Sequence, residues 1–149
     1  MHIVLVEPQI PQNTGNIARL CAATSCDLHL VKPLGFETSD YYLRRAGLDY
    51  WDKVHIVFHE SFELFWADGE DKRCWFGSTK AAMPYTRAQF QSEDYLIFGN
   101  ETRGLPESFI TSHKEIGLTI PMWNDSRSLN LSNAVAIILY EALRQVRGF

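Results

Sequence analysis

Residues 120–143 read IPMWNDSRSLNLSNAVAIILYEAL, and this stretch decides the fold. An apolar run ends at Pro121, a polar loop follows, and the chain then enters a long apolar segment. Residues 131–146 contain neither proline nor glycine, and Asn130 or Ser132 can cap them, so we predict a helix there. A polar turn between a strand and a helix gathers backbone N–H groups, hydroxyls and amides around one small volume, which suits a ligand with many polar edges.

The predicted terminal helix is apolar on more than one side. One stripe at helical spacing consists of Leu131, Ala134, Val135, Ile138, Leu139 and Ala142, and further apolar surface comes from Ala136, Ile137, Tyr140 and Leu143. The first helix of the chain has a similar excess, with small residues at Ala18, Cys21 and Ala22. Because a helix that is apolar nearly all round is buried on more than one side, we predict that a second copy of the chain covers these helices in a homodimer.

The composition is that of an ordinary soluble globular protein. The chain has 149 residues, of which 46% are hydrophobic and 21% charged, and we predict a single domain over residues 1–149. No run approaches the length of a membrane span, and the N-terminal HIVLVEP is too short for a signal peptide, so we expect a cytoplasmic protein without a membrane partner. The cysteines Cys21, Cys26 and Cys74 form no CxxC pair, which favours reduced thiols.

Apolar runs rich in valine, isoleucine and aromatic residues alternate with helical segments along the chain. The runs predict strands at residues 2–7, 28–31, 54–58, 74–78, 95–98 and 117–120. Besides the terminal helix, we predict helices that open at residues 13–16 and that cover residues 39–46, 61–66 and 106–112. This alternation indicates an α/β protein with a mostly parallel six-stranded sheet flanked by helices.

Polar junctions follow several of the predicted strands, at residues 8–16, 77–80, 99–104 and 121–130. In parallel sheets, ligands lie beyond the carboxyl ends of the strands. The chain contains neither GxGxxG nor GxxxxGK[ST], which argues against a dinucleotide-binding fold and an NTPase. The five histidines show no metal-ligand spacing, so we expect no metal site. A net charge of -4 argues mildly against nucleic-acid binding over the whole surface but leaves room for a local basic face.

Three of these junctions carry motifs in a fixed order: NTGNIAR at residues 13–19, FGNETRG at 98–104, and IPM at 120–122 with SLNLSNA at 128–134. Together they resemble the SPOUT methyltransferases, a family of RNA ribose methylases with a C-terminal trefoil knot. PQNTGNIARL at residues 11–20, LRRAGLDYW at 43–51, and the lack of an added RNA-binding domain look most similar to the branch that methylates the wobble nucleotide 34 of tRNA. The resemblance implies the knot, which pattern reasoning alone rejects because knots are nearly absent from proteins.

The resemblance also implies a cofactor and a set of site residues. S-adenosylmethionine would bind at Gly77, Gly99, Ile120, Met122, Ser128 and Leu129. Arg19 matches the catalytic arginine of the family, and Asn130 matches the asparagine of its third motif. The residues that we expect to contact tRNA are Asn13, Arg44, Arg45, Glu101, Arg103, Tyr140 and Arg144.

The chemistry of ribose methylation requires few groups. A ribose hydroxyl loses its proton while it attacks a methyl group on a sulfonium, so alignment and charge placement dominate. Because the pKa of arginine lies above about 12, we favour Arg19 as the group that fixes the adjacent phosphate and stabilises the developing alkoxide. Phosphate, water and Arg19 itself stay open as acceptors of the proton.

Each motif alone also has a purely structural interpretation. Asn13 can cap the first helix, Gly99 can serve a turn, and Ser128 or Asn130 can cap the last helix. Two hypotheses from different classes therefore stay open: a tRNA ribose methylase, and a non-catalytic α/β module that binds a nucleotide or RNA. Within the enzyme class, ribosomal RNA is the rival substrate, and the sequence selects neither the tRNA species nor its base.

Overall fold

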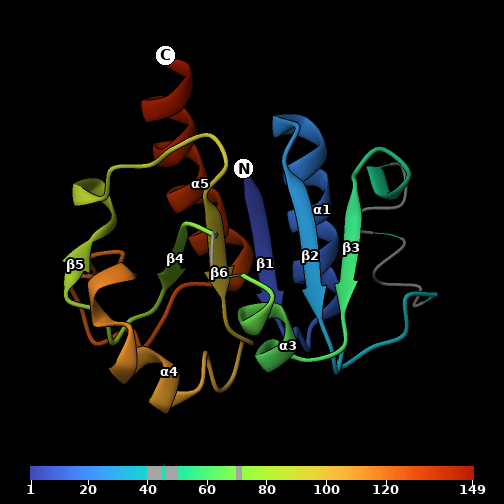
Figure 1. The fold of residues 1–149 in the computed structure, drawn as a ribbon, viewed down its shortest axis with the longest axis horizontal. Helices are drawn as coiled ribbons and strands as arrows, with labels where there is room; N and C mark the ends of the chain where they lie inside the picture. The colour runs from blue at the N-terminus through green and yellow to red at the C-terminus, as the bar shows by residue number, and fades with distance from the viewer. Residues whose placement is uncertain (40–44, 46–49, 70–71) are drawn as a thin grey trace.

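The computed structural model describes residues 1–39, 45, 50–69 and 72–149, and within them seven strands form one sheet (Figure 1). The strands are β1 His2–Val6, β2 Asp27–Val31, β3 Ile56–His59, β4 Cys74–Gly77, β5 Met83–Pro84, β6 Tyr95–Phe98 and β7 Gly117–Thr119. Their order across the sheet is β3-β2-β1-β6-β4-β7-β5, and every neighbouring pair is parallel. The α-helices are α1 Pro11–Thr24, α3 Phe62–Ala67, α4 Glu107–Ser112 and α5 Leu131–Arg147. Two 3-10 turns are also present, η1 Tyr85–Arg87 and η2 Lys114–Ile116.

The α/β class, the parallel sheet and the flanking helices confirm the sequence prediction, with one correction. The prediction of six strands was wrong because it missed one strand of the described sheet, the short edge strand β5, Met83–Pro84. Two residues give no alternating pattern, and proline is tolerated at an edge because no further strand requires its missing N–H. The helix predicted at residues 39–46 lies almost wholly outside the described residues, and the trefoil knot stays a prediction.

The two long helices begin differently. α1 starts at Pro11 after Ile10, which has an extended backbone and makes no side-chain capping bond. Asn13 therefore lies inside the helix and does not cap it, because proline at the first position already starts the turn. α5 begins as predicted, where the Asn130 side chain accepts a hydrogen bond from the Ser132 N–H. It ends at Gly148, whose φ of 69° closes the helix in the left-handed conformation.

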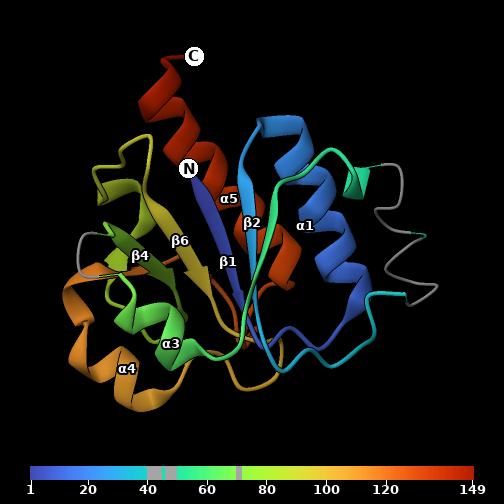
Figure 2. The same cartoon turned by 45° about the vertical axis from the view of Figure 1, so that its right-hand side comes forward.

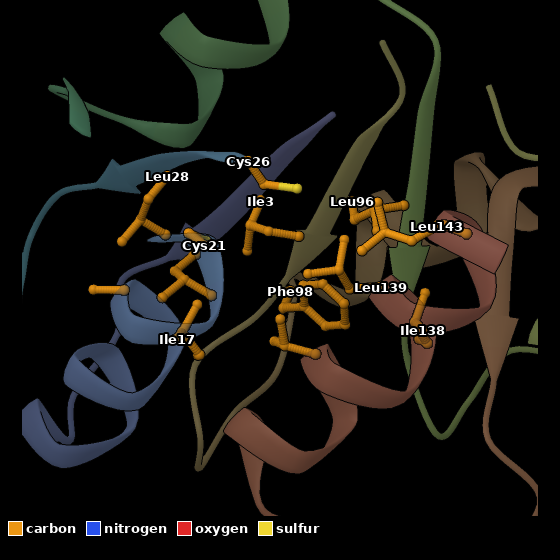
Figure 3. Close-up of a cluster of buried hydrophobic side chains, with 14 of the residues drawn as sticks. Ile3, Ile17, Cys21, Cys26, Leu28, Leu96, Phe98, Ile138, Leu139 and Leu143 are labelled. Atoms are coloured by element: carbon orange, nitrogen blue, oxygen red, sulfur yellow. The ribbon is translucent and has the colours of Figure 1, made fainter. Parts of the chain in front are cut away.

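Alternate residues of the central strands face two separate cores. Ile3 and Leu5 of β1 lie in a cluster with residues of α1 and α5, whereas Val4 and Val6 lie in a second cluster with residues of α3 and α4. α1 and α5 accordingly lie together on one side of the sheet, and α3 lies on the other (Figures 1 and 2). Figure 3 shows side chains of α1 and α5 converging on the strands between them.

The apolar surplus of the two long helices has different fates. Ala18 and Cys21 of α1 are completely buried within the chain, in the core that α1 shares with α5. The expectation that these two residues face a second copy was therefore wrong, since packing within one chain already covers them. On α5 the surplus is real: Ala136 and Ile137 are only partly covered, and Tyr140 is 48% exposed. Within the described residues, no helix is long and apolar enough to span a membrane.

Candidate functional site

A cavity of about 490 Å³ lies at the carboxyl ends of β4, β6 and β7. The parallel register brings these ends together, because Gly77 pairs with Phe98 on one side and with Leu118 on the other. Residues 77–80, 98–105 and 127–131 contribute to its wall, as do Asn13 of α1 and Ile138 of α5. All the predicted polar junctions thus contribute to one cavity, whose size is typical of small-molecule sites.

Two glycines shape the loop after β6. A Cβ atom on Gly99 would lie 2.1 Å from the carbonyl carbon of Gly104, so the backbone approaches itself too closely for any side chain. Gly104 has a φ of 69° and donates its N–H to the Asn100 carbonyl at 3.0 Å. The Asn100 side chain closes the turn by accepting from the N–H groups of Thr102 and Arg103 at 3.1 and 2.7 Å. The loop is therefore a compact unit held by its own backbone.

Glu101 ties this loop to the start of α1. Its carboxylate accepts hydrogen bonds from the backbone N–H groups of Gln9 and Ile10, at 2.8 and 3.1 Å, and from Asn13 Nδ2 at 3.1 Å. Asn13 Oδ1 in turn accepts from Asn130 Nδ2 at 3.0 Å. One polar chain thus connects the loop after β1, the loop after β6 and the cap of α5, so the three motifs hold one another in place.

The structure brings together all six residues that the family resemblance implied for the cofactor. Gly77, Gly99, Ile120, Met122, Ser128 and Leu129 all line the cavity. At Gly77 a Cβ atom would lie 2.7 Å from the Phe98 ring, so this glycine lets the floor of the cavity pack closely. The lining combines apolar side chains with exposed amides, hydroxyls and backbone groups.

The residues expected in catalysis and RNA contact divide into two groups. Asn13, Glu101, Arg103 and Asn130 line the cavity, whereas Arg19, Arg45, Tyr140 and Arg144 do not. Arg44 lies outside the described residues. Arg19 is exposed on α1 and its guanidinium lies 5.1 Å from the Tyr50 ring centroid. Because Arg19 follows Asn13 by six residues, it lies about 9 Å further along the helix and about a third of a turn round from it.

Two of the arginines expected to contact RNA are paired with acidic side chains of the same chain. Arg103 Nη2 lies 3.1 Å from a carboxylate oxygen of Glu7. Arg144 donates to both carboxylate oxygens of Glu141, at 2.9 and 2.8 Å, and these bonds with that from Gln145 lower the pKa of Glu141 to about 2. Both arginines are exposed, so each ion pair is weak and open to exchange with a phosphate.

Two cationic residues at the cavity were missed as site residues. Lys80 and Arg127 both line it, and Lys80 is paired with Glu107 of α4. Their positions inside the predicted junctions at 77–80 and 121–130 were the available signal. Cations beside a cavity attract an anionic ligand or substrate.

The SpoU rRNA Methylase family model matches residues 1–140. The chain belongs to this family. Its sequence is 48% identical to the tRNA (cytidine(34)-2'-O)-methyltransferase of Yersinia pestis, with 98% of this chain and 94% of the relative covered. It is 46% identical to the protein of the same name from Escherichia coli K12, with 98% and 94% covered. The predicted relationship to the trefoil-knot methylases is thereby confirmed.

Solved structures agree with this membership. The chain superposes with a TM-score of 0.94 on a structure described as "Structural insights into the 2-OH methylation of C/U34 on tRNA", at 45% identity and with 99% of this chain and 97% of the other covered. An RNA 2'-O ribose methyltransferase superposes with a TM-score of 0.84 at 23% identity, with 100% of this chain and 57% of that chain covered. The second match shows a shared fold alone.

Proposed function

We propose that the protein methylates the ribose 2'-hydroxyl of the wobble nucleotide 34 of a tRNA, with S-adenosylmethionine as the methyl donor. The observation that carries this proposal is the convergence of the three sequence motifs on one cavity. The identity of almost half over nearly the whole chain to relatives named for this reaction supports the same substrate. Residues 1–149 form the domain that would carry this activity.

The residues present fit S-adenosylmethionine. The cavity of about 490 Å³ has apolar walls from Met122 and Leu129, which suit an adenine ring, and polar groups near Ser128, which suit a ribose and an amino acid. Gly99 also lines the cavity, and the backbone of Gly104 and Leu105 fills the space that a side chain would need there. S-adenosylmethionine bound here would supply an electrophilic methyl group on a sulfonium. No metal ion takes part in the proposed transfer.

Arg19 and Asn130 serve the reaction in different ways. A guanidinium with a pKa above about 12 is a poor base, so Arg19 fixes the phosphate beside nucleotide 34 and stabilises the negative charge that develops on the ribose oxygen. Asn130 is held at the cavity by its bonds to Asn13 and Ser132, and it orients the loop that precedes α5. Alignment and charge placement thus come from two parts of the chain that do not share one cavity wall.

A homodimer resolves this separation. Arg19 does not line the cavity of its own chain. Separately, α5 leaves Tyr140 exposed and Ile137 only partly covered. Pairing of two copies about a two-fold axis covers this α5 surface and sets Arg19 of one protomer at the cavity of its partner. Arg44, Arg45 and Arg144 then provide a local face for one tRNA across both protomers.

Nucleoside mapping by mass spectrometry tests the proposal in the cell. In a strain that lacks the gene, a tRNA should lose the 2'-O-methyl group at nucleotide 34, and the wild-type gene, but not the Arg19→Ala variant, should restore it. Unchanged tRNA would contradict the proposal. Loss of a methyl group from ribosomal RNA alone would favour the rival substrate.

A further inference from the structure

A row of imidazoles crosses three strands of the sheet on the side that α3 covers. His29 of β2 is central: its Nε2 lies 3.3 Å from His2 Nδ1, and its Nδ1 lies 2.9 Å from His59 Nε2. Phe65 of α3 packs against the row, with its ring centroid 5.0 Å from that of His59. His2 opens β1, His29 is the middle residue of β2 and His59 ends the edge strand β3, and none of the three lines the cavity.

A carboxylate lies beside this row of rings. The register pairs His2 with Asp27, and the two-residue period of β2 sets His29 on the same face as Asp27. An Asp27 oxygen lies 3.3 Å from His2 Nδ1, and one ligand atom from each of His2, Asp27 and His29 falls within 4.8 Å of the others. His2 Nδ1 therefore has both an Asp27 oxygen and His29 Nε2 at 3.3 Å, although a ring nitrogen carries at most one proton.

Two of the three separations match those of ligands around a tetrahedral metal, and the third is within 4.8 Å. With Zn–N and Zn–O bonds of about 2.0–2.1 Å, two ligand atoms of a tetrahedral zinc site lie about 3.3 Å apart. Both contacts of His2 Nδ1, to His29 Nε2 and to Asp27, have this length. The three side chains thus lie close enough together for one cation to link them.

The outward-facing nitrogens of both rings also have the partners that metal-ligating histidines require. Such a ring donates its other N–H to a carboxylate or similar acceptor, which fixes its tautomer. His29 Nδ1 has His59 Nε2 at 2.9 Å, and His2 Nε2 has a Glu93 oxygen at 3.5 Å. Protons on these outer nitrogens leave His29 Nε2 and His2 Nδ1 as free lone pairs aimed at the shared volume.

We propose that His2, Asp27 and His29 bind one divalent transition-metal ion of the Zn²⁺ type, with water as the fourth ligand. The ion would link the amino ends of β1 and β2 and would serve the fold, since the methyl-transfer cavity lies at the opposite ends of the strands. No local sequence pattern indicates the site, because His2 lies 25 residues before Asp27 in the chain and only the register brings them together.

Calorimetry with ZnCl₂ on untagged full-length protein, after removal of metal with EDTA, tests the proposal. We expect one ion per chain, with affinity at least tenfold weaker in Asp27→Asn and in His29→Gln. His59→Gln, which removes only the outer partner of His29, should weaken binding by about tenfold or more. His113→Gln, which removes the imidazole that follows α4 and contacts the Phe109 carbonyl, should bind as the wild type does.

Circular dichroism on each variant confirms that it is folded before the titration. If His29→Gln does not fold, Asp27→Asn still tests the proposal, because asparagine keeps the shape of the aspartate side chain. Absence of saturable zinc uptake by the wild type would overturn the proposal and leave a hydrogen-bonded row of histidines. Equal affinity in wild type and folded Asp27→Asn would overturn it as well, as would a loss of binding in His113→Gln.

Discussion

Replacing Glu101 with alanine would release three N–H donors that its carboxylate now accepts. The donor on Ile10 is exposed and returns to water, whereas those on Gln9 and Asn13 are partly buried. Hydrogen bonds to a charged group contribute about 1.5–3 kcal/mol each, so the loss of two gives a decrease of about 3 kcal/mol in the free energy of unfolding. For a domain of this size, that decrease lowers the melting temperature by about 6–12 °C.

Glutamine at the same position separates the charge from the contacts. Glu101 Oε1 accepts from Ile10 and Asn13, and Oε2 accepts from Gln9. If glutamine places its carbonyl oxygen where Oε1 lies, its NH2 group faces the Gln9 N–H, so two donors meet. This mismatch should lower the free energy of unfolding by about 1–2 kcal/mol. We therefore expect wild type, Glu101→Gln and Glu101→Ala in decreasing order of stability.

Chemical denaturation followed by circular dichroism measures these differences in stability, and calorimetry with S-adenosylhomocysteine measures the affinity of the cavity for this ligand. Both Glu101 variants should bind this ligand more weakly, because the loop after β6 lines the cavity. Glu37→Ala, at an exposed site in a loop, is the matched control and should change neither quantity. If the free energy of unfolding of Glu101→Ala lies within about 0.5 kcal/mol of the wild-type value, the stabilising role of the Glu101 hydrogen bonds is refuted, since ordinary surface substitutions reach that range.

Three further predictions concern the glycines, the histidines and the dimer. Gly99→Ala should destabilise the domain by about 3 kcal/mol because the backbone opposite cannot move aside, whereas Gly104→Ala, with open space around its Cβ, should cost about 1–2 kcal/mol for the left-handed backbone; equal effects in denaturation would refute this account. Burial, with the neighbouring charges of His2 and His59, lowers the pKa of His29 from 6.5 to about 4, so in EDTA the unfolded state takes up the proton first and stability should fall as the pH drops from 6.5 to 4; a wild-type slope identical to that of His29→Gln would contradict it. Finally, an equimolar mixture of Arg19→Ala and Leu129→Glu, each inactive alone, should recover about a quarter of wild-type methylation, since random pairing makes half the dimers mixed and each mixed dimer has one intact site; no recovery after subunit exchange would reject an Arg19 that acts on the partner.

Local patterns in the sequence predicted the elements and much of the cavity. The α5 segment has no helix breaker, and Asn130 is a strong cap, so its start was predictable to the residue. The cavity followed from the rule that ligands lie beyond the carboxyl ends of parallel strands, applied to the glycines and amides found there.

The remaining features depend on contacts between residues far apart in the chain. The row at His2, His29 and His59 exists only because of strand register, which no single-sequence pattern encodes. Glu101 was expected to contact RNA from its motif, and this stays a prediction. Its hydrogen bonds to the backbone of Gln9 and Ile10 join distant parts of the chain, so no local pattern indicates them. The absence of Arg19 from the cavity wall could be predicted only with the start of α1 at Pro11 known, because that start sets where Arg19 lies around the helix.

Methylation of a defined tRNA by the purified protein tests the central claim most directly. The protein would be incubated with labelled S-adenosylmethionine and either an all-ribose tRNA or the same tRNA with a 2'-deoxyribose at nucleotide 34 only. We predict that the first substrate gains one methyl group, located by mass spectrometry on the ribose of nucleotide 34, and that the second gains none. Equal methylation of both tRNAs, or a methyl group on any other nucleotide, would contradict the account.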